Sequence, residues 1–215
     1  MIQDIWPKHL DNQYKNLKPG NEDTVFYFQG SSLLARPSGH FNLQNSEENV
    51  LIYPQYDEFV QGIKSSYGDK AVDNFEFIYL LSIDEEHFFL ARKTGSLERG
   101  TFLGEMADSA VHKDMYSFVR GYEFIGVDSF RKAQPREHAY AAITAFHLYG
   151  WYRDNHFCGR CGKPLKHDDK QRMLRCDCCK NMVFPKICPA VIVAVTDKDR
   201  ILLTKYAGRT YRNLS

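Results

Sequence analysis

The chain has 215 residues, and its 28 lysine and arginine residues nearly balance its 27 aspartate and glutamate residues. This balance excludes a global electrostatic field that would attract nucleic acid or an acidic partner. The 15 Phe and 13 Tyr residues favour a packed core over disorder. No apolar run approaches the roughly 20 residues that a membrane helix needs, and the N-terminus lacks the apolar centre of a signal peptide. We therefore expect a soluble, cytoplasmic protein with no membrane partner.

The N-terminal part of the chain is predicted to be an α+β domain. Short strands are expected at Thr24–Phe28 and Ser32–Arg36, joined by a glycine turn. Two longer runs, Phe75–Ser82 and His87–Lys93, are rich in aromatic and aliphatic residues and flank an acidic turn, which predicts a β-hairpin. Val119–Val127 is a further candidate strand.

A long helix is predicted to follow these strands. Pro135 suits the first position of a helix, and His138–Tyr152 is rich in alanine without internal proline. Apolar residues recur there at spacings of three and four, so the helix has one apolar face. Asn155 favours its end. The helix leads directly into the cysteine-rich segment, and we expect it to link the two parts of the chain.

The cysteines of this chain are clustered. All six follow residue 157, and none precedes it. Clustering of this kind favours metal binding over a disulfide framework. Cys158-Gly-Arg-Cys161 and Cys176-Asp-Cys-Cys179 are two Cys-x-x-Cys turns that can present four thiolates to one ion. Four sulfur ligands without an open position indicate a structural Zn²⁺ ion held by Cys158, Cys161, Cys176 and Cys179.

Several alternatives to this ligand set stay open at the level of sequence. The four cysteines could form two disulfides, or Cys178 could replace Cys179 as a ligand in a less favourable Cys-x-Cys turn. His156 and His167 are further candidate ligands, although four cysteines already fill the site. Gly162 follows the first pair at the position where such a turn often requires a positive φ.

Two more strands are predicted after the cysteines. Ala190–Thr196 is a β-branched run typical of a buried strand. Asp197–Asp199 predicts a turn, and Ile201–Tyr206 the next strand.

Three segments resemble a known family. Trp151–Gly162 with its first cysteine pair, Cys176–Cys179, and the run Phe184-Pro-Lys-Ile-Cys-Pro-Ala-Val-Ile192 are similar to the NAD(H) diphosphatase (NADH pyrophosphatase) branch of the Nudix hydrolases. The segment Arg200–Lys205 looks like the opening hairpin of the Nudix fold. The resemblance implies an N-terminal α+β domain (1–134), a linking helix (135–155), a zinc ribbon (156–186) and the first strands of a Nudix α/β/α sandwich (187–215).

The resemblance also implies a reaction. Members of this family hydrolyse the pyrophosphate of NADH or NAD⁺ to nicotinamide mononucleotide and AMP, and some remove NAD caps from RNA. They act as homodimers, with Mg²⁺ or Mn²⁺ held by glutamates. On this basis Phe184 is expected to stack on a ring of the dinucleotide, and Arg131 to contact its phosphates. Packing of Phe184 against the ribbon and a surface salt bridge of Arg131 are the alternatives.

The catalytic motif of the family is missing from the sequence. It reads Gly-x5-Glu-x7-Arg-Glu-x2-Glu-Glu-x-Gly and clusters metal-binding carboxylates on a helix. No Arg-Glu-x-x-Glu-Glu occurs in these 215 residues, and only seven residues follow Gly208. We therefore expect a chain truncated before the motif, without catalytic residues and inactive on its own.

A rival hypothesis is a non-catalytic zinc ribbon that binds nucleic acid or mediates dimerisation. The ribbon carries six cations that could form a basic surface: Arg160, Lys163, Lys166, Lys170, Arg172 and Arg175. Acidic residues interrupt this group and aromatic stacking platforms are sparse, which favours the enzyme family.

Overall fold

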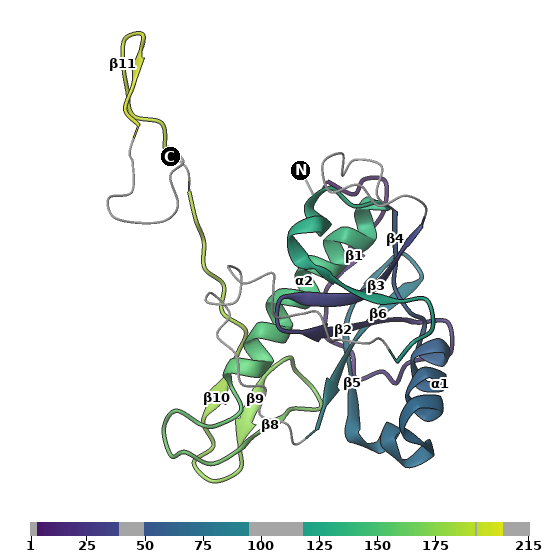
Figure 1. Ribbon diagram of the computed structural model, residues 1–215. Helices are drawn as coiled ribbons and strands as arrows, with labels where there is room; N and C mark the ends of the chain where they lie inside the picture. Colours follow the sequence, from purple (N-terminus) through teal and green to yellow (C-terminus); the bar gives the residue numbers. More distant parts are fainter. Residues whose placement is uncertain (1–3, 39–49, 95–117, 192, 204–215) are drawn as a thin grey trace. The chain divides into compact units, whose positions relative to one another are not determined.

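The computed structural model describes residues 4–38, 50–94, 118–191 and 193–203, without the side chains of Arg131 and Lys132. The chain divides into two units at Pro185 and Lys186. The first unit contains a mixed sheet, two α-helices and a small three-stranded sheet, and the second contains a short hairpin (Figure 1). The protein is therefore of mixed α+β class, while the division into four segments stays a prediction.

The larger sheet of the first unit has seven strands in the part of the chain that the structure describes. Six follow the order β1-β5-β6-β2-β3-β4, and β7 pairs with β3. The contact between β2 and β6 is parallel, and the other pairings in this sheet are antiparallel. The strands are β1 (Leu10–Asp11), β2 (Thr24–Gln29), β3 (Ser32–Ser38), β4 (Val50–Ile52), β5 (Phe75–Ile83), β6 (Glu86–Lys93) and β7 (Glu123–Gly126).

The sheet is buried on both faces because its strands alternate two sets of apolar side chains. Phe26 and Phe28 pack in one core together with the long helix α2 (Arg136–Asp154). Val25 and Tyr27, which alternate with Phe26 and Phe28 along β2, pack in a second core with the helix α1 (Tyr56–Tyr67). The two helices thus cover opposite faces of one sheet (Figure 1). Short 3₁₀ helices η2 (Asp69–Asn74) and η4 (Val127–Lys132) complete this layer arrangement.

Most of the predicted elements in this unit are confirmed. The first two strands and their turn correspond to β2 and β3, and the predicted hairpin to β5 and β6. The predicted linking helix is α2, although Pro135 is its N-cap residue rather than its first helical residue. The candidate strand at Val119–Val127 is shorter in the structure, where β7 begins only at Glu123.

The sequence analysis did not predict helix α1, which contains a glycine in its interior. Gly62 inside a helix normally costs stability. Here a Cβ at this position would lie 2.8 Å from the carbonyl oxygen of Phe118, so only glycine permits this close approach. Phe59 and Ile63, one turn apart, are fully buried and attach the helix to the sheet.

The ribbon follows α2 and consists of three short antiparallel strands. These are β8 (Leu165–His167), β9 (Leu174–Cys176) and β10 (Met182–Val183), in the order β10-β9-β8. Leu174 is buried, and Leu165 and Val183 pack beside it against the core that contains α2. The Arg172 guanidinium donates a hydrogen bond to the carbonyl oxygen of Leu80 in β5. The ribbon is therefore docked on the larger sheet by both apolar and polar contacts.

A partly buried histidine joins the ribbon to α2. His167 in β8 lies 2.7 Å from the Tyr152 hydroxyl through Nε2, and 2.7 Å from the Asp168 carbonyl oxygen through Nδ1. Since a carbonyl oxygen can only accept, Nδ1 carries the proton and Nε2 accepts from the Tyr152 O–H. Tyr152 is fully buried. A neutral imidazole fits both contacts, and burial favours this form because desolvation lowers the pKa of His167.

The second unit shows one pair of strands in its described part. β11 (Thr196–Asp197) and β12 (Arg200–Ile201) form an antiparallel hairpin, and Lys198 in the turn has φ 53°. The predicted turn at Asp197–Asp199 is confirmed. The predicted buried strand at Ala190–Thr196 is wrong, because Thr196 alone among its described residues belongs to a strand and Val191 is 84% exposed. A β-branched run forms a strand only where a neighbouring strand pairs with it.

The strand predicted at Ile201–Tyr206 includes only Ile201 in the structure, and residues 204–206 lie outside the described part. Within the described residues, none of the helices combines the length and apolar character needed to cross a membrane.

The neutral state of His167 predicts a pH-dependent stability. Burial lowers the pKa of His167 from its ordinary value of 6.5. Below about pH 6.5 the unfolded chain then binds more protons than the folded one, so stability falls as the pH decreases. We expect His167→Gln to reduce the loss of stability between about pH 7.5 and 5.5 in urea unfolding curves. His147→Gln, an exposed histidine on α2, is the matched control and should keep the wild-type slope. An equal change of stability with pH in all three proteins would contradict the neutral state of His167 in the folded protein.

Candidate metal centre

Two turns of the same backbone geometry carry the four cysteines. In the first turn, the Cys158 N–H donates to the Lys163 carbonyl oxygen at 2.8 Å, and the Gly162 N–H donates to the Cys158 carbonyl oxygen at 2.8 Å. In the second turn, the Cys176 N–H donates to the Asn181 carbonyl oxygen at 2.9 Å, and the Lys180 N–H donates to the Cys176 carbonyl oxygen at 3.0 Å. Each pair of bonds closes one tight turn and turns two thiols toward the same point.

The left-handed residue of each turn occupies the same position relative to its first cysteine. Gly162 has φ 71°, which confirms the prediction for the first turn, and Lys180 has φ 60° in the second. Lysine at this φ carries a steric cost that glycine avoids. Sequence reasoning missed Lys180, although the repeat of the Cys-x-x-Cys spacing points to it.

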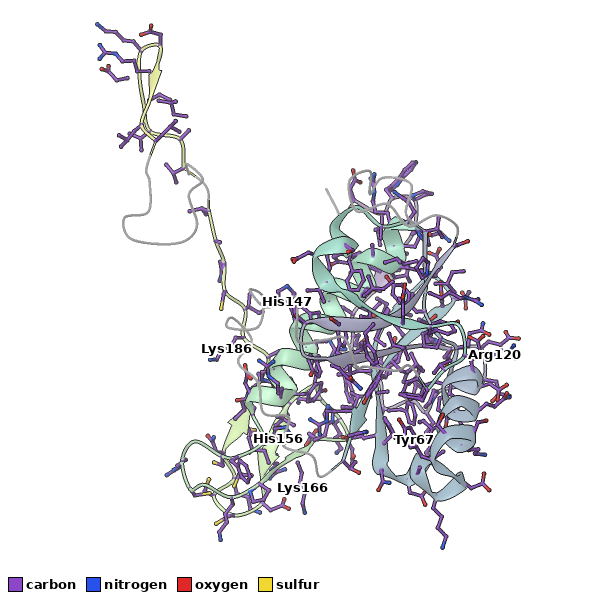
Figure 2. All side chains as sticks on the ribbon, viewed as in Figure 1. Tyr67, Arg120, His147, His156, Lys166 and Lys186 are labelled. Carbon is purple, nitrogen blue, oxygen red and sulfur yellow. The ribbon has the colours of Figure 1, made fainter. Side chains whose placement is uncertain are left out.

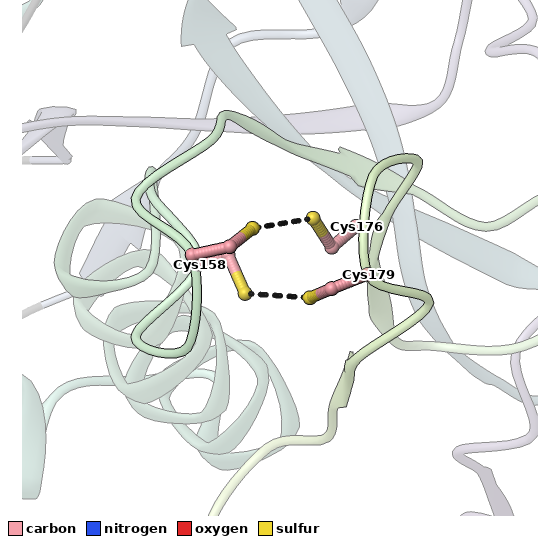
Figure 3. Close-up of side chains that lie close together, drawn as sticks. Cys158, Cys176 and Cys179 are labelled. Carbon is pink, nitrogen blue, oxygen red and sulfur yellow. Dashed lines mark hydrogen bonds between the residues drawn. The ribbon is translucent and has the colours of Figure 1, made fainter.

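The four sulfur atoms form one compact group. The Sγ atoms of Cys158, Cys161, Cys176 and Cys179 all lie within 4.8 Å of one another. The sulfur atoms of the Cys158–Cys179 and Cys161–Cys176 pairs are separated by 3.5 and 3.4 Å. Figure 3 labels Cys158, Cys176 and Cys179 and marks the sulfur contacts with dashed lines. Cys158 and Cys176 are buried, whereas Cys161 is exposed. The group therefore lies at the surface of the ribbon with two of its ligands in the interior.

Backbone N–H groups around the sulfur atoms favour the thiolate form. The Arg160 N–H donates to the Cys158 Sγ at 3.4 Å, and this bond lowers the pKa of the Cys158 thiol to about 6. The Cys179 N–H likewise lowers the pKa of Cys176. The Asn181 side-chain amide adds a contact of 3.6 Å to the Cys158 sulfur. The pKa values of the Cys161 and Cys179 thiols are instead raised, because their contacts with neighbouring cysteine sulfur atoms and burial outweigh the N–H groups of Lys163 and Asn181. Since the thiolate is the form that ligates metals, the backbone donors favour that form at Cys158 and Cys176.

The geometry fits a tetrahedral ion. A Zn–S distance of about 2.3 Å places tetrahedral sulfur ligands about 3.8 Å apart, and the two closest pairs here are 3.4 and 3.5 Å apart. The sulfur atoms are also too far apart for a disulfide, whose S–S bond is about 2.0 Å, and all six cysteines are free. Four cysteines in this arrangement can hold a metal ion such as zinc.

The alternative ligands lie outside this group. Cys178 is exposed, and the group of close ligand atoms contains Cys179 instead. His167 is engaged by Tyr152 and Asp168 as described above. His156 donates no ligand atom to the group, and its carbonyl oxygen accepts the Leu165 N–H at 2.9 Å. These placements favour the four-cysteine set.

The structure describes the side chain of only one of the two candidate substrate residues. Phe184 follows β10 and is 49% exposed, so one side of its ring is open to a planar partner. Arg131 belongs to η4, but its side chain lies outside the described part. The structure does not bring these two residues together in any described contact, and both roles stay predictions.

The fold and the site define a class of protein in which a four-thiol ribbon is docked on an α+β domain. No protein-family model matches the chain. Similar proteins are the NAD-capped RNA hydrolases NudC, which confirms the resemblance to the NADH pyrophosphatase branch of the Nudix hydrolases over part of the chain.

Three of these relatives give the extent of the similarity. The NudC of Pseudomonas aeruginosa strain LESB58 is 38% identical over 55 residues, which are 26% of this chain and 20% of the relative. That of Salmonella typhi is 36% identical over 59 residues, or 27% and 23% of the two chains. That of Pseudomonas putida strain W619 is 40% identical over 55 residues, or 26% and 20%. The similarity thus spans about a fifth of the length of each relative.

Replacing a ligand should remove the metal. We expect the wild-type protein to bind about one zinc ion per chain, and Cys176→Ser to lose it, because a fully buried ligand is removed. Cys178→Ser changes an exposed cysteine two residues further along the chain and should leave the metal content unchanged. Elemental analysis and cobalt absorption spectra measure both effects. Metal loss in Cys178→Ser with retention in Cys176→Ser would reverse the ligand assignment.

The two turns should respond in opposite ways to substitution at the left-handed position. Gly162→Ala should destabilise the metal-bound ribbon by about 1–2 kcal/mol through backbone strain alone, since a Cβ there would meet nothing within 4 Å. Lys180→Gly should be neutral or stabilising, because it relieves the same strain. Competition with a chelator, with protein stability measured in parallel, tests both. A neutral Gly162→Ala would contradict the left-handed conformation of the first turn.

Proposed function

We propose that this chain is the N-terminal and zinc-ribbon part of an NAD(H) diphosphatase of the Nudix superfamily. The observation that carries the proposal is the identity of 36–40% with the NudC proteins, in a chain whose four cysteines are grouped for a metal. The reaction would be hydrolysis of the pyrophosphate of NADH or NAD⁺ to nicotinamide mononucleotide and AMP. NAD-capped RNA is a further substrate, in keeping with the name of the relatives.

Zinc has a structural role in this proposal. When bound by Cys158, Cys161, Cys176 and Cys179, it would fix the two turns and thereby the start of β10 and the segment that follows it. Four thiolates leave no open position for water on the ion, so it takes no part in hydrolysis. The residues of the ribbon instead present Phe184, whose half-exposed ring can stack on a base or on nicotinamide. Arg131 is the proposed phosphate contact.

The residues of this chain do not fit the Mg²⁺ or Mn²⁺ that the family uses. Such ions require clustered oxygen ligands. Within the described ranges, the four cysteines are the group of three or more side chains that could hold a metal, and the carboxylate motif is absent from the sequence. We therefore propose that the 215 residues are inactive alone. From the family resemblance we also propose that residues 187–215 begin a Nudix domain and that the protein is a cytoplasmic homodimer.

The rival nucleic-acid ribbon is weakened by the contacts of its cations. Lys166, which Figure 2 labels on the ribbon, forms an ion pair of 2.6 Å with Asp177. Arg172 is partly buried and donates to the Leu80 carbonyl oxygen. Two of the six cations are thus engaged within the protein, and Asp168 and Asp169 divide the remaining four into two pairs along the sequence. This leaves the enzyme family as the better supported function.

Hydrolysis of NADH tests the proposed function. We expect no nicotinamide mononucleotide or AMP from the 215-residue chain with Mg²⁺ or Mn²⁺. A form extended after residue 215 by a segment carrying the Gly-x5-Glu-x7-Arg-Glu-x2-Glu-Glu-x-Gly motif should release both. In the extended form, Phe184→Ala should lower kcat/KM by about tenfold through the loss of stacking, whereas Met182→Ala on the neighbouring strand is the control. Failure of the extended form to cleave NADH would contradict the family function, and cleavage by the short chain would contradict its inactivity.

A further inference from the structure

The four thiols of the metal centre differ in their access to solvent. Cys161 is exposed and Cys179 is half-buried, whereas Cys158 and Cys176 are buried. A reagent that arrives from solvent therefore meets Cys161 first. With zinc bound, Cys161 is a thiolate, because a thiol that coordinates a metal is deprotonated outright. Exposure and thiolate character are the two properties that decide which cysteine of a protein is oxidised.

The exposed sulfur has a second sulfur within reach in the other turn. The Cys161 and Cys176 sulfur atoms lie 3.4 Å apart, and those of Cys158 and Cys179 lie 3.5 Å apart. Each close pair joins one cysteine of the first turn to one cysteine of the second. A disulfide has an S–S bond of about 2.0 Å, so either pair would have to close by about 1.4 Å. The geometry therefore favours disulfides between the two turns.

Strand β9 connects this centre to the surface on which the ribbon is docked. Cys176 is the last residue of β9, and Leu174, two residues earlier, packs in the core that contains α2. Met173 is also buried, and Arg172 donates its hydrogen bond to the Leu80 carbonyl oxygen. Because protein interiors are close-packed, a displacement of Cys176 is transmitted to these neighbours. The state of the metal centre and the docking of the ribbon are thus coupled along one short strand.

We propose that the metal centre is an oxidant-sensitive switch, in which hydrogen peroxide oxidises Cys161, zinc leaves and the docking of the ribbon is loosened. The Cys161 thiolate attacks one peroxide oxygen, so that an S–O bond forms, the O–O bond breaks and hydroxide leaves. The Cys176 thiolate then attacks the sulfenic sulfur, which forms the disulfide and releases a second hydroxide. The two thiolates supply the two electrons that the peroxide takes up. The ion has then lost two of its four ligands and dissociates.

The remaining thiols have defined places in this scheme. Cys158 and Cys179 can form the second disulfide with a second molecule of peroxide. Cys178 is exposed on the same turn as Cys176, but it lies outside the group of close ligand atoms. The switch rests on the proposed binding of zinc by the four cysteines and does not depend on the proposed NAD(H) hydrolysis.

Treatment of the zinc-loaded chain with hydrogen peroxide tests the switch. We expect release of about one zinc ion per chain to a chromogenic chelator, together with a Cys161–Cys176 disulfide in tryptic peptides. Trypsin cuts after Arg160 and Arg175, which separates Cys158 from Cys161 and both from the second turn. Hydrogen exchange of β9 should become faster as zinc is released, because its docking contacts loosen. A dithiol reductant with fresh zinc should reverse all three changes.

Two variants locate the site of oxidation. Cys178→Ser is the matched control, because it removes an exposed thiol from the same turn, and it should release zinc at the wild-type rate. Cys161→Ser removes the proposed first site, and the zinc that it retains should be released at least about tenfold more slowly. If Cys161→Ser retains no zinc, the disulfide map of the wild type and the rate of Cys178→Ser still decide the outcome.

Several results would overturn the proposal. The first is full retention of zinc by the wild type in excess peroxide, and the second is zinc release that Cys178→Ser abolishes. The third is release with sulfinic or sulfonic acids in place of a disulfide, which a dithiol cannot reverse. Unchanged hydrogen exchange of β9 after zinc release would overturn the coupling to docking. A reduced chain that binds no zinc would overturn the metal assignment and the switch together.

Discussion

The arrangement of the first unit depends on the contacts of the buried Tyr152 side chain. Its ring lies in the core formed by the sheet and α2, and the Arg92 guanidinium lies over it at 5.1 Å. Its hydroxyl reaches the ribbon through His167 at 2.7 Å. One residue near the end of the helix therefore contacts the sheet, the helix core and the ribbon at once. Since the hydroxyl is buried, it must be satisfied by the imidazole, and this fixes how β8 lies against α2.

Sequence predicted those parts of the fold that local pattern determines. The runs Phe75–Ser82 and His87–Lys93 are rich in aromatic and aliphatic residues and flank an acidic turn, and the structure pairs them as expected. The spacing of the cysteines likewise predicted the turns that group their sulfur atoms. In both cases the information lies within a short stretch of chain, where turn geometry and side-chain periodicity decide the outcome.

The features that were missed depend on contacts distant in sequence. Helix α1 accommodates Gly62 because the Phe118 backbone lies against it, a contact between residues 56 positions apart. His167 reads as a spare metal ligand, because nothing in its own segment indicates a buried tyrosine in α2 as its partner. The apolar run at Ala190–Thr196 has the composition of a strand, but pairing decides whether it forms one. A pocket lined by Tyr14, Arg92 and His167 was missed for the same reason, because these residues meet only in the folded chain.

The parallel pairing of β2 with β6 has a consequence for how this protein folds. Thr24 is paired with Phe88, and Tyr27 with Ala91, so the centre of the sheet joins segments that are far apart along the chain. Such contacts require the closure of a long loop before they contribute stability, and they slow the folding of the domains that contain them. The cysteine turns need only local closure. The ribbon can therefore bind its metal before the sheet has folded. A metal-loaded ribbon would then form earlier than the surface of the sheet on which it docks.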